Sequence, residues 1–149
     1  MWTVPDRGAF PAPPKFYAQL PEIACWQPEK GIEIHSRAYC IPLLHEEIQD
    51  FVDEHYPEDA QYASSAQKIY AFCGLFAEHL PEGMKPRLAH VYVPCDTAVW
   101  RAIAIVIATN RSAGDRELGR DCEALVHQLH KTYNTTNAAG WYFIASDDD

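Results

Sequence analysis

The chain has 149 residues and a formal net charge of −9, from 12 basic and 21 acidic side chains. This length is typical of one domain, so we treat residues 1–149 as a single domain that can bury a core without disulfides or metal ions. The acidic balance argues against a surface for nucleic acid, because phosphate binding needs clustered lysine and arginine.

Residues 1–28 differ in composition from the rest of the chain. Seven of the 11 prolines fall within residues 1–42, and proline favours extended geometry over regular ladder hydrogen bonds. Large apolar side chains still punctuate the segment, among them Trp2, Phe10 and Phe16, whereas a solvated linker carries few of them. We therefore predict an arm that packs onto the folded core or onto a partner.

The first regular element is predicted over residues 31–41. Apolar side chains alternate there with Glu33, His35 and Arg37, which is the pattern of a half-buried strand. Pro42 is expected to end this strand.

Two helices are then expected in series. Apolar residues at helical spacing predict a helix over residues 43–56 that ends at Pro57. A second helix is expected over residues 60–80, with Asp59 as its N-cap. The apolar positions of this second helix are Tyr62, Ala66, Ile69, Cys73, Phe76 and Leu80.

A hairpin follows the helices. The segments 87–94 and 99–109 are rich in β-branched and aromatic residues and are separated by a short connection. The second segment is apolar on both faces apart from Arg101, which indicates a central strand.

A third helix over residues 118–133 and a last strand over residues 141–145 complete the order β-α-α-β-β-α-β, within a core of residues 29–146 that precedes the acidic tail 147–149. This order predicts the α+β class, as a two-layer sandwich in which helices cover one face of an antiparallel sheet of about four strands. It is the split β-α-β arrangement of ferredoxin-like domains. The residues expected to be buried include Ile69, Phe76, Ile103, Ile105, Leu125 and Leu129.

Targeting features are not expected. The start, residues 1–6, has no cationic segment followed by an apolar one, so we expect no secretion signal. The apolar run at residues 103–108 is too short to span a membrane. We therefore expect a cytoplasmic protein that has no contact with a membrane. Its five cysteines are then expected to be reduced and to pack as small hydrophobic side chains: Cys25, Cys40, Cys73, Cys95 and Cys122.

Histidine and cysteine side chains raise two chemical alternatives. His127 and His130 are three residues apart on the third helix and could reach one metal ion, but further ligands would have to come from elsewhere. Cys95, in the hairpin connection, could act as a nucleophile if His90 or His35 lay within hydrogen-bond reach. Histidines on a polar helix face and an idle thiol explain the same residues, so we expect neither a metal ion nor another cofactor.

The segment 111–116, with the sequence RSAGDR, follows a strong strand and opens a helix. It resembles the Arg/Gln-x-x-Gly-x-Gly/Ala loop of the GNAT N-acyltransferases, whose backbone amides hold the coenzyme A pyrophosphate at a helix N-terminus. The resemblance covers residues 99–142 and departs from the motif at Arg116, where the family has a small residue. It implies a small or degenerate acyl-CoA-dependent transferase in which Arg111, Gly114 and Arg116 hold the cofactor.

The strongest charge feature is acidic. Seven carboxylates fall within residues 46–59, which contain no lysine or arginine. Such a helix face forms either an ordinary solvated surface or a docking surface for a basic partner. The residues assigned to partner binding are Glu46, Glu47, Asp50, Asp53 and Glu54 on the first helix and Trp2, Phe10 and Phe16 in the arm.

Together these features favour a small acidic protein that acts by binding another protein rather than by catalysis. It could be an inhibitor or immunity-type protein, or a subunit of a larger assembly such as a phage particle. Self-association is also open. The alternatives from another class are the GNAT-like transferase and an enzyme that uses a metal ion or a thiol.

Overall fold

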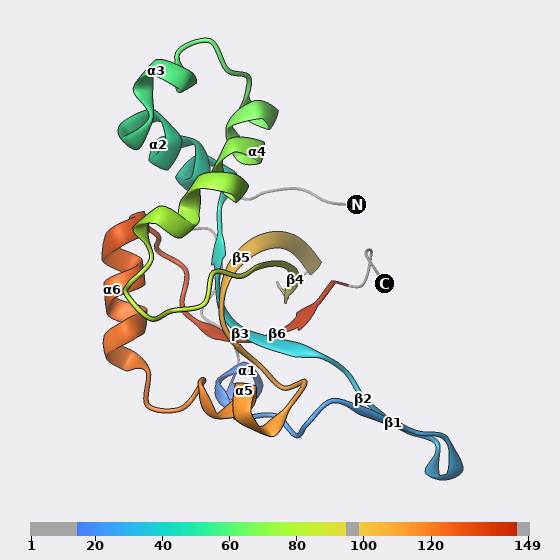
Figure 1. Ribbon diagram of the computed structural model, residues 1–149. Coiled ribbons are helices and arrows are strands. Elements are labelled where there is room, and N and C mark those ends of the chain that lie inside the picture. Colours follow the sequence, from blue (N-terminus) through green and yellow to red (C-terminus); the bar gives the residue numbers. More distant parts are fainter. Residues whose placement is uncertain (1–14, 95–98, 146–149) are drawn as a thin grey trace.

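The computed structural model describes residues 15–94 and 99–145, and its centre is a small closed sheet (Figure 1). Four antiparallel strands pair in the cyclic order β3-β5-β4-β6, so each strand has two hydrogen-bonded neighbours. Closure leaves these strands without an unpaired edge. The strands are β3 (Arg37–Leu43), β4 (Leu88–Pro94), β5 (Val99–Thr109) and β6 (Gly140–Ile144).

The α+β class and the antiparallel sheet expected from the sequence are confirmed. β4 and β5 pair over seven positions as the expected hairpin, and β5 also pairs with β3, which makes it an inner strand. A ferredoxin-like sandwich is not confirmed, because β4 also pairs with β6 through Val91 and Ile144 and the sheet closes on itself.

A second, two-stranded sheet projects from the closed sheet (Figure 1). It consists of β1 (Cys25–Gln27) and β2 (Ile32–Ile34), joined by the 3-10 turn η1 (Pro28–Lys30). The single strand expected over residues 31–41 is therefore wrong, since the chain leaves the hairpin at residues 35–36 before β3 begins.

β3 is buried on both of its faces, unlike the half-buried strand that was expected. Cys40 packs in the interior of the closed sheet with residues from all four strands, whereas Ile41 packs with the helices. Pro42 lies within the strand, opposite Ala104, and does not end it. Arg37, expected on the solvent face, is only 6% exposed.

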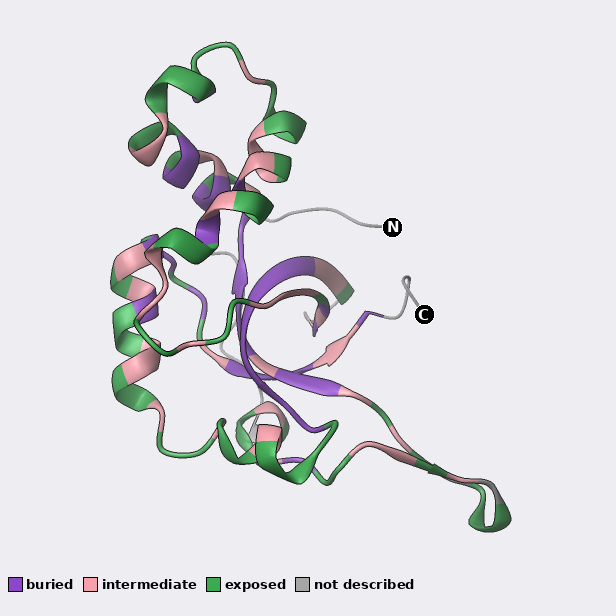
Figure 2. Ribbon diagram, viewed as in Figure 1, coloured by how far each residue is buried: buried purple, intermediate pink, exposed green. Residues whose placement is uncertain are grey.

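Helices cover one side of the closed sheet (Figure 1). Their buried side chains, including Phe51, Phe72 and Leu129, pack with Ile41 and Ile105 from the strands, and Figure 2 shows this buried seam. Burial of this apolar surface is the main force that holds the two layers together. The helices on this side are α2 (His45–His55), α3 (Pro57–Ala60), α4 (Ser65–Leu75), η2 (Phe76–His79) and α6 (Glu123–Tyr133).

The second expected helix is divided in the structure, and the third begins later than expected. Ser64, not Asp59, is the N-cap of α4, since its hydroxyl oxygen accepts a hydrogen bond from the amide of Gln67 at 3.2 Å. The third helix, expected from residue 118, begins only at Glu123 as α6, because the positive φ of 48° at Asp121 interrupts the right-handed helical conformation. Leu118, the first residue of the expected helix, lies outside α6 and is exposed.

Two short helices complete the described chain, α1 (Lys15–Ala18) beside β6 and α5 (Ala113–Glu117) beside β5. Of the expected core residues, two are half-buried at the rim of the core, Ile69 and Leu125, and the rest are buried: Phe76, Ile103, Ile105 and Leu129. Within the described residues, no helix has the length and apolar character needed to cross a membrane.

Candidate functional site

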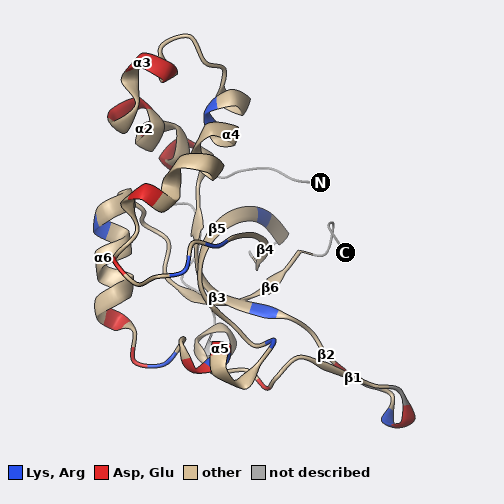
Figure 3. Cartoon of the chain, in the orientation of Figure 1, with Lys and Arg blue, Asp and Glu red and all other residues tan. Residues whose placement is uncertain are grey.

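The exposed carboxylates of α2 and α3 form a surface that projects with these helices away from the closed sheet (Figure 3). Lys68 of α4 lies beside it and pairs with Asp53 at 2.7 Å. This acidic helical surface consists of Glu46, Asp50, Asp53, Glu54, Glu58 and Asp59.

Glu47 does not belong to this surface, contrary to its assignment from the sequence. Its side chain is 2% exposed and accepts hydrogen bonds from the amide of Leu44 at 2.9 Å, the amide of Thr136 at 2.9 Å and the hydroxyl of Thr135 at 3.3 Å. The carboxylate therefore joins the start of α2 to the segment after α6. Its role is structural, because buried acceptors need such partners.

Two tyrosines of the helical layer that carries the acidic surface are almost fully exposed. Tyr62, between α3 and α4, is 88% exposed and Tyr70 of α4 is 84% exposed. The other exposed residues of α4 are Gln67, three small residues and Cys73, which was expected to be buried. The sequence held a signal for this, because α4 has apolar residues on both faces and only one face can pack on the core.

Helix α1, which lies in the described part of the arm, packs onto the protein's own core. The guanidinium carbon of Arg37 lies 4.3 Å from the ring centroid of Phe16, and Nη2 donates to the Phe16 carbonyl at 3.3 Å. Tyr17 stacks on Tyr142 of β6 with a centroid distance of 5.4 Å. Of the arm residues assigned to binding, Phe16 is thus half exposed and held in place, whereas Trp2 and Phe10 lie outside the described residues.

Arg37 is held without a carboxylate partner among the described residues. Nε and Nη2 both donate to the carbonyl of Trp141, at 3.1 and 2.8 Å. Burial lowers the pKa of this guanidinium below its ordinary value. The residue joins α1 to β6 through carbonyl oxygens and aromatic faces.

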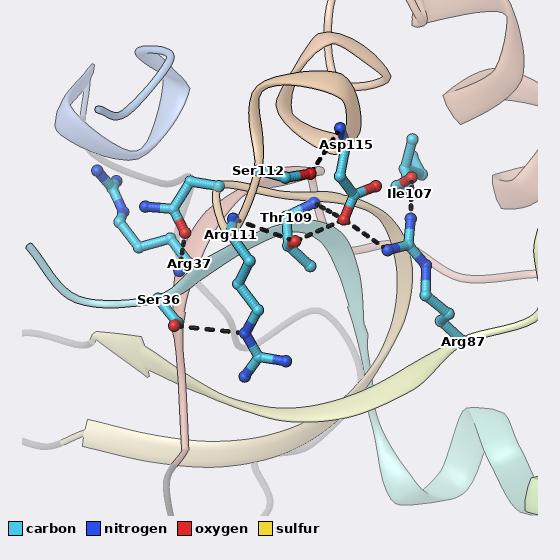
Figure 4. A network of polar contacts seen from close by, with 9 residues as sticks. Ser36, Arg37, Arg87, Ile107, Thr109, Arg111, Ser112 and Asp115 are labelled. Carbon is cyan, nitrogen blue, oxygen red and sulfur yellow. Dashed lines mark hydrogen bonds and ion pairs between the residues drawn. The ribbon is translucent and has the colours of Figure 1, made fainter. Parts of the chain in front are cut away.

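A polar network surrounds the end of β5 (Figure 4). The carboxylate of Asp115 pairs with Arg87 at 2.7 Å and accepts hydrogen bonds from the amide and the hydroxyl of Thr109. Burial by itself would raise the pKa of Asp115, but the hydrogen bonds and charge of Arg87 together with the bonds of Thr109 outweigh it, so the pKa lies below its ordinary value. Asp115 therefore stays ionised and ties α5 to the sheet.

The three residues of the GNAT-like loop do not converge on one position. Arg111 is exposed and its Nε donates to Ser36 at 3.4 Å, whereas Nε of Arg116 donates to the carbonyl of Pro21 at 2.6 Å. Gly114 has open space around it. The helix that follows, α5, has only five residues, and its N-cap Ser112 already accepts from the backbone amide of Asp115.

The histidine pair shows no arrangement for a shared metal ion among the described residues. His127 is exposed, and Nε2 of His130 lies 2.7 Å from the carbonyl oxygen of Asn137. In the part of the chain that the structure describes, no three side chains of His, Cys, Asp or Glu are placed to share a metal ion. Cys95 lies outside the described residues, so its distance to His90 or His35 is not defined.

A groove of about 820 Å³ lies between the β1–β2 hairpin and the closed sheet. Its lining comes from α1, both hairpin strands, β4, β5, β6, the residues just before β3 and Arg111 beyond the end of β5, so no local sequence pattern could have revealed it. The side chains that decide its chemistry are aromatic or charged: Tyr17, Trp26, Tyr92, Phe143, His35 and Arg111.

The floor of this groove is held in place by Asn110, which is fully buried at the end of β5. Its side-chain nitrogen donates to the carbonyls of Glu22 at 2.8 Å and His35 at 3.0 Å, one on each side of the hairpin. Its backbone carbonyl accepts from the amide of Ala24 at 2.7 Å. One residue therefore fixes both ends of the hairpin to the sheet.

Comparison of the chain with known protein families, with curated protein sequences and with solved structures found no match.

Proposed function

We propose that this chain is a small cytoplasmic protein that acts by binding another protein through the acidic helical surface, with a basic surface on the partner. It works as an inhibitor or immunity-type protein or as a subunit of a larger assembly, such as a phage particle. Its core would be a closed variant of the ferredoxin-like split β-α-β arrangement.

The observation that carries this proposal is that one helical layer presents both exposed carboxylates and exposed tyrosines. Tyr62 and Tyr70 offer large apolar area at a low cost in side-chain entropy, and tyrosine is enriched where proteins bind each other. Exposed carboxylates on the same layer speed the encounter with a basic partner and disfavour acidic ones. The helices carry both features on a rigid support, because α2 and α4 pack against each other.

Comparative capture from the native host tests the proposal. The wild-type chain is immobilised beside the triple variant Asp50→Lys, Glu54→Lys, Glu58→Lys. The matched control is Glu82→Lys, Glu117→Lys, Glu123→Lys, which changes the net charge equally at exposed positions outside the surface. Thermal unfolding of all three proteins checks that folding is intact, since exposed charges contribute little to stability.

The proposal expects a basic protein that the wild-type chain and the control retain and that the triple variant loses. Mass spectrometry of the captured proteins provides the measurement. Identical captured sets for all three proteins, or no protein enriched by the wild-type chain, would contradict the proposal.

A further inference from the structure

The groove beside the hairpin has the size and lining of a small-molecule site. Its volume of about 820 Å³ falls within the range of roughly 300–1,000 Å³ that ligand sites occupy. The lining is mainly apolar and aromatic, with a few polar groups that could fix the orientation of a ligand. None of its lining residues belongs to α2 or α3, so the groove is separate from the acidic helical surface.

The aromatic walls of the groove are positioned around Phe143. The rings of Tyr17 and His35 stand nearly perpendicular to the Phe143 ring, at 87° and 83°, each with a centroid distance of 6.3 Å. The guanidinium carbon of Arg37 lies over the same ring, 5.0 Å from its centroid, and helps to hold that ring in place. These fixed planar surfaces suit a flat apolar group, which packs on aromatic faces and edges.

Trp26 adds a further planar surface from the hairpin. It is 60% exposed although it is the largest apolar side chain in β1. An exposed tryptophan that lines a concave surface offers apolar area that a ligand can cover. The hairpin that carries it is fixed at both ends by Asn110, so the wall is present before any ligand arrives.

The charged end of the groove is positive. Arg111 lines it, and Figure 4 shows its side chain extending past Ser36, away from the carboxylate of Asp115. Arg111 also lines an adjoining cavity of about 620 Å³ whose other charged side chains are Lys85, Arg87 and Asp115. Three basic residues against one acidic residue give this adjoining cavity a positive charge in a chain whose net charge is −9.

Glu33, the acidic residue that lines the groove, lies 3.6 Å from Nδ1 of His35. The guanidinium of Arg111, in contrast, has only the hydroxyl of Ser36 as a side-chain partner among the described residues. Its planar fork of donors matches the geometry of a carboxylate or a similar oxyanion.

We infer that the groove binds a small organic anion with a flat apolar body. The anionic group pairs with Arg111, and the body packs between Trp26 and Phe143. This inference is independent of the proposed partner binding, which uses a different surface.

The test uses three probes of the same shape: naphthalene-2-carboxylate, the neutral 2-naphthalenemethanol and the cationic 2-naphthylmethylammonium. Each is titrated into the isotope-labelled full chain, and binding is followed by amide chemical shifts in two-dimensional NMR. The inference expects saturable shifts for the carboxylate at residues that line the groove, with weaker binding of the alcohol and still weaker binding of the ammonium.

Two variants and one control locate the contacts. Arg111→Gln should weaken binding of the carboxylate probe about tenfold, the loss expected for one charge-assisted hydrogen bond. It should leave the affinity for the alcohol unchanged. Trp26→Ala should weaken all probes that bind. Arg120→Gln, an exposed arginine outside the groove, should change none of them.

Three results would overturn the inference. The first is the absence of saturable binding by the carboxylate at millimolar concentration. The second is equal affinity of Arg111→Gln and wild type for the carboxylate, and the third is shifts that map away from the groove. Because all three variants alter exposed side chains, their spectra should otherwise match that of the wild-type protein.

Discussion

Arg37 and Asn110 hold each other through backbone and side chain at the point where β3 begins and β5 ends. The amide of Arg37 donates to the side-chain oxygen of Asn110 at 2.7 Å, and the amide of Asn110 donates to the carbonyl of Arg37 at 3.1 Å. The side-chain nitrogen of Asn110 remains free to bind the hairpin carbonyls. The pair therefore determines how the hairpin, the arm and the sheet are joined.

Replacing Asn110 should destabilise the protein and loosen the hairpin. Asn110→Ala removes three side-chain hydrogen bonds, one buried and two partly buried, and leaves their partners unsatisfied, so the free energy of unfolding should fall by about 2–4 kcal/mol. Urea denaturation provides the measurement. Gln128→Ala, at an exposed position of α6, is the control and should change the free energy of unfolding by less than about 0.5 kcal/mol. Equal stabilities of the two variants would show that Asn110 does not fix the hairpin.

Glu47 and Glu54 lie on the same helix and should respond differently to the same change. Glu47→Gln replaces one acceptor oxygen of a buried carboxylate by a donor, so it should lower the free energy of unfolding by about 1–3 kcal/mol. Glu54→Gln alters an exposed side chain and should leave stability nearly unchanged. Thermal unfolding of the two variants gives the comparison. A neutral effect of Glu47→Gln would mean that its carboxylate does not join α2 to the segment after α6.

The contribution of Asp115 to stability should depend on pH. Its folded-state pKa lies below the ordinary value, so its contribution is present above the unfolded pKa of about 3.9 and is lost as pH falls through the folded pKa. Asp115→Asn should therefore be less stable than wild type at pH 6, and the difference should shrink below about pH 4. Unfolding curves measured from pH 6 to pH 3 check this. A difference that stays constant or grows on acidification would contradict the ion pair with Arg87.

Phe72 and Tyr70, two residues apart on α4, test which face of this helix packs on the core. Phe72 is fully buried, so Phe72→Ala should lower the free energy of unfolding by about 3–5 kcal/mol. Tyr70→Ala should change it by less than about 0.5 kcal/mol, because Tyr70 is 84% exposed. Chemical denaturation distinguishes the two. A large loss for Tyr70→Ala would mean that its side chain is covered by its own chain.

The elements that the sequence predicted well are those governed by local pattern. β5 was recognisable because an unbroken apolar run with one arginine suits an inner strand, and α2 because its apolar residues recur at helical spacing. The breaks in the other helices were missed, since Ser64 and Asp121 act through capping and backbone conformation rather than through periodicity.

What the sequence could not give depends on contacts between distant segments. The pairing of β4 with β6 closes the sheet. The paired residues are about fifty positions apart, and no pattern in either segment indicates that the two strands pair. Glu47 and Glu54 are indistinguishable as acidic residues in one helix, and only the segment after α6 makes one of them a buried acceptor. Arg37 was expected on a solvent face because its cover, the arm, comes from elsewhere in the chain.

The most direct test of the proposed function is the association rate of the captured partner as a function of salt concentration. Steering by the acidic helical surface predicts that Asp50→Lys, Glu54→Lys, Glu58→Lys lowers the association rate constant at least about tenfold at low salt. The same variant should also flatten its salt dependence, whereas Glu82→Lys, Glu117→Lys, Glu123→Lys should change both far less. An unchanged rate constant and an unchanged salt dependence in the first variant would contradict binding through this surface.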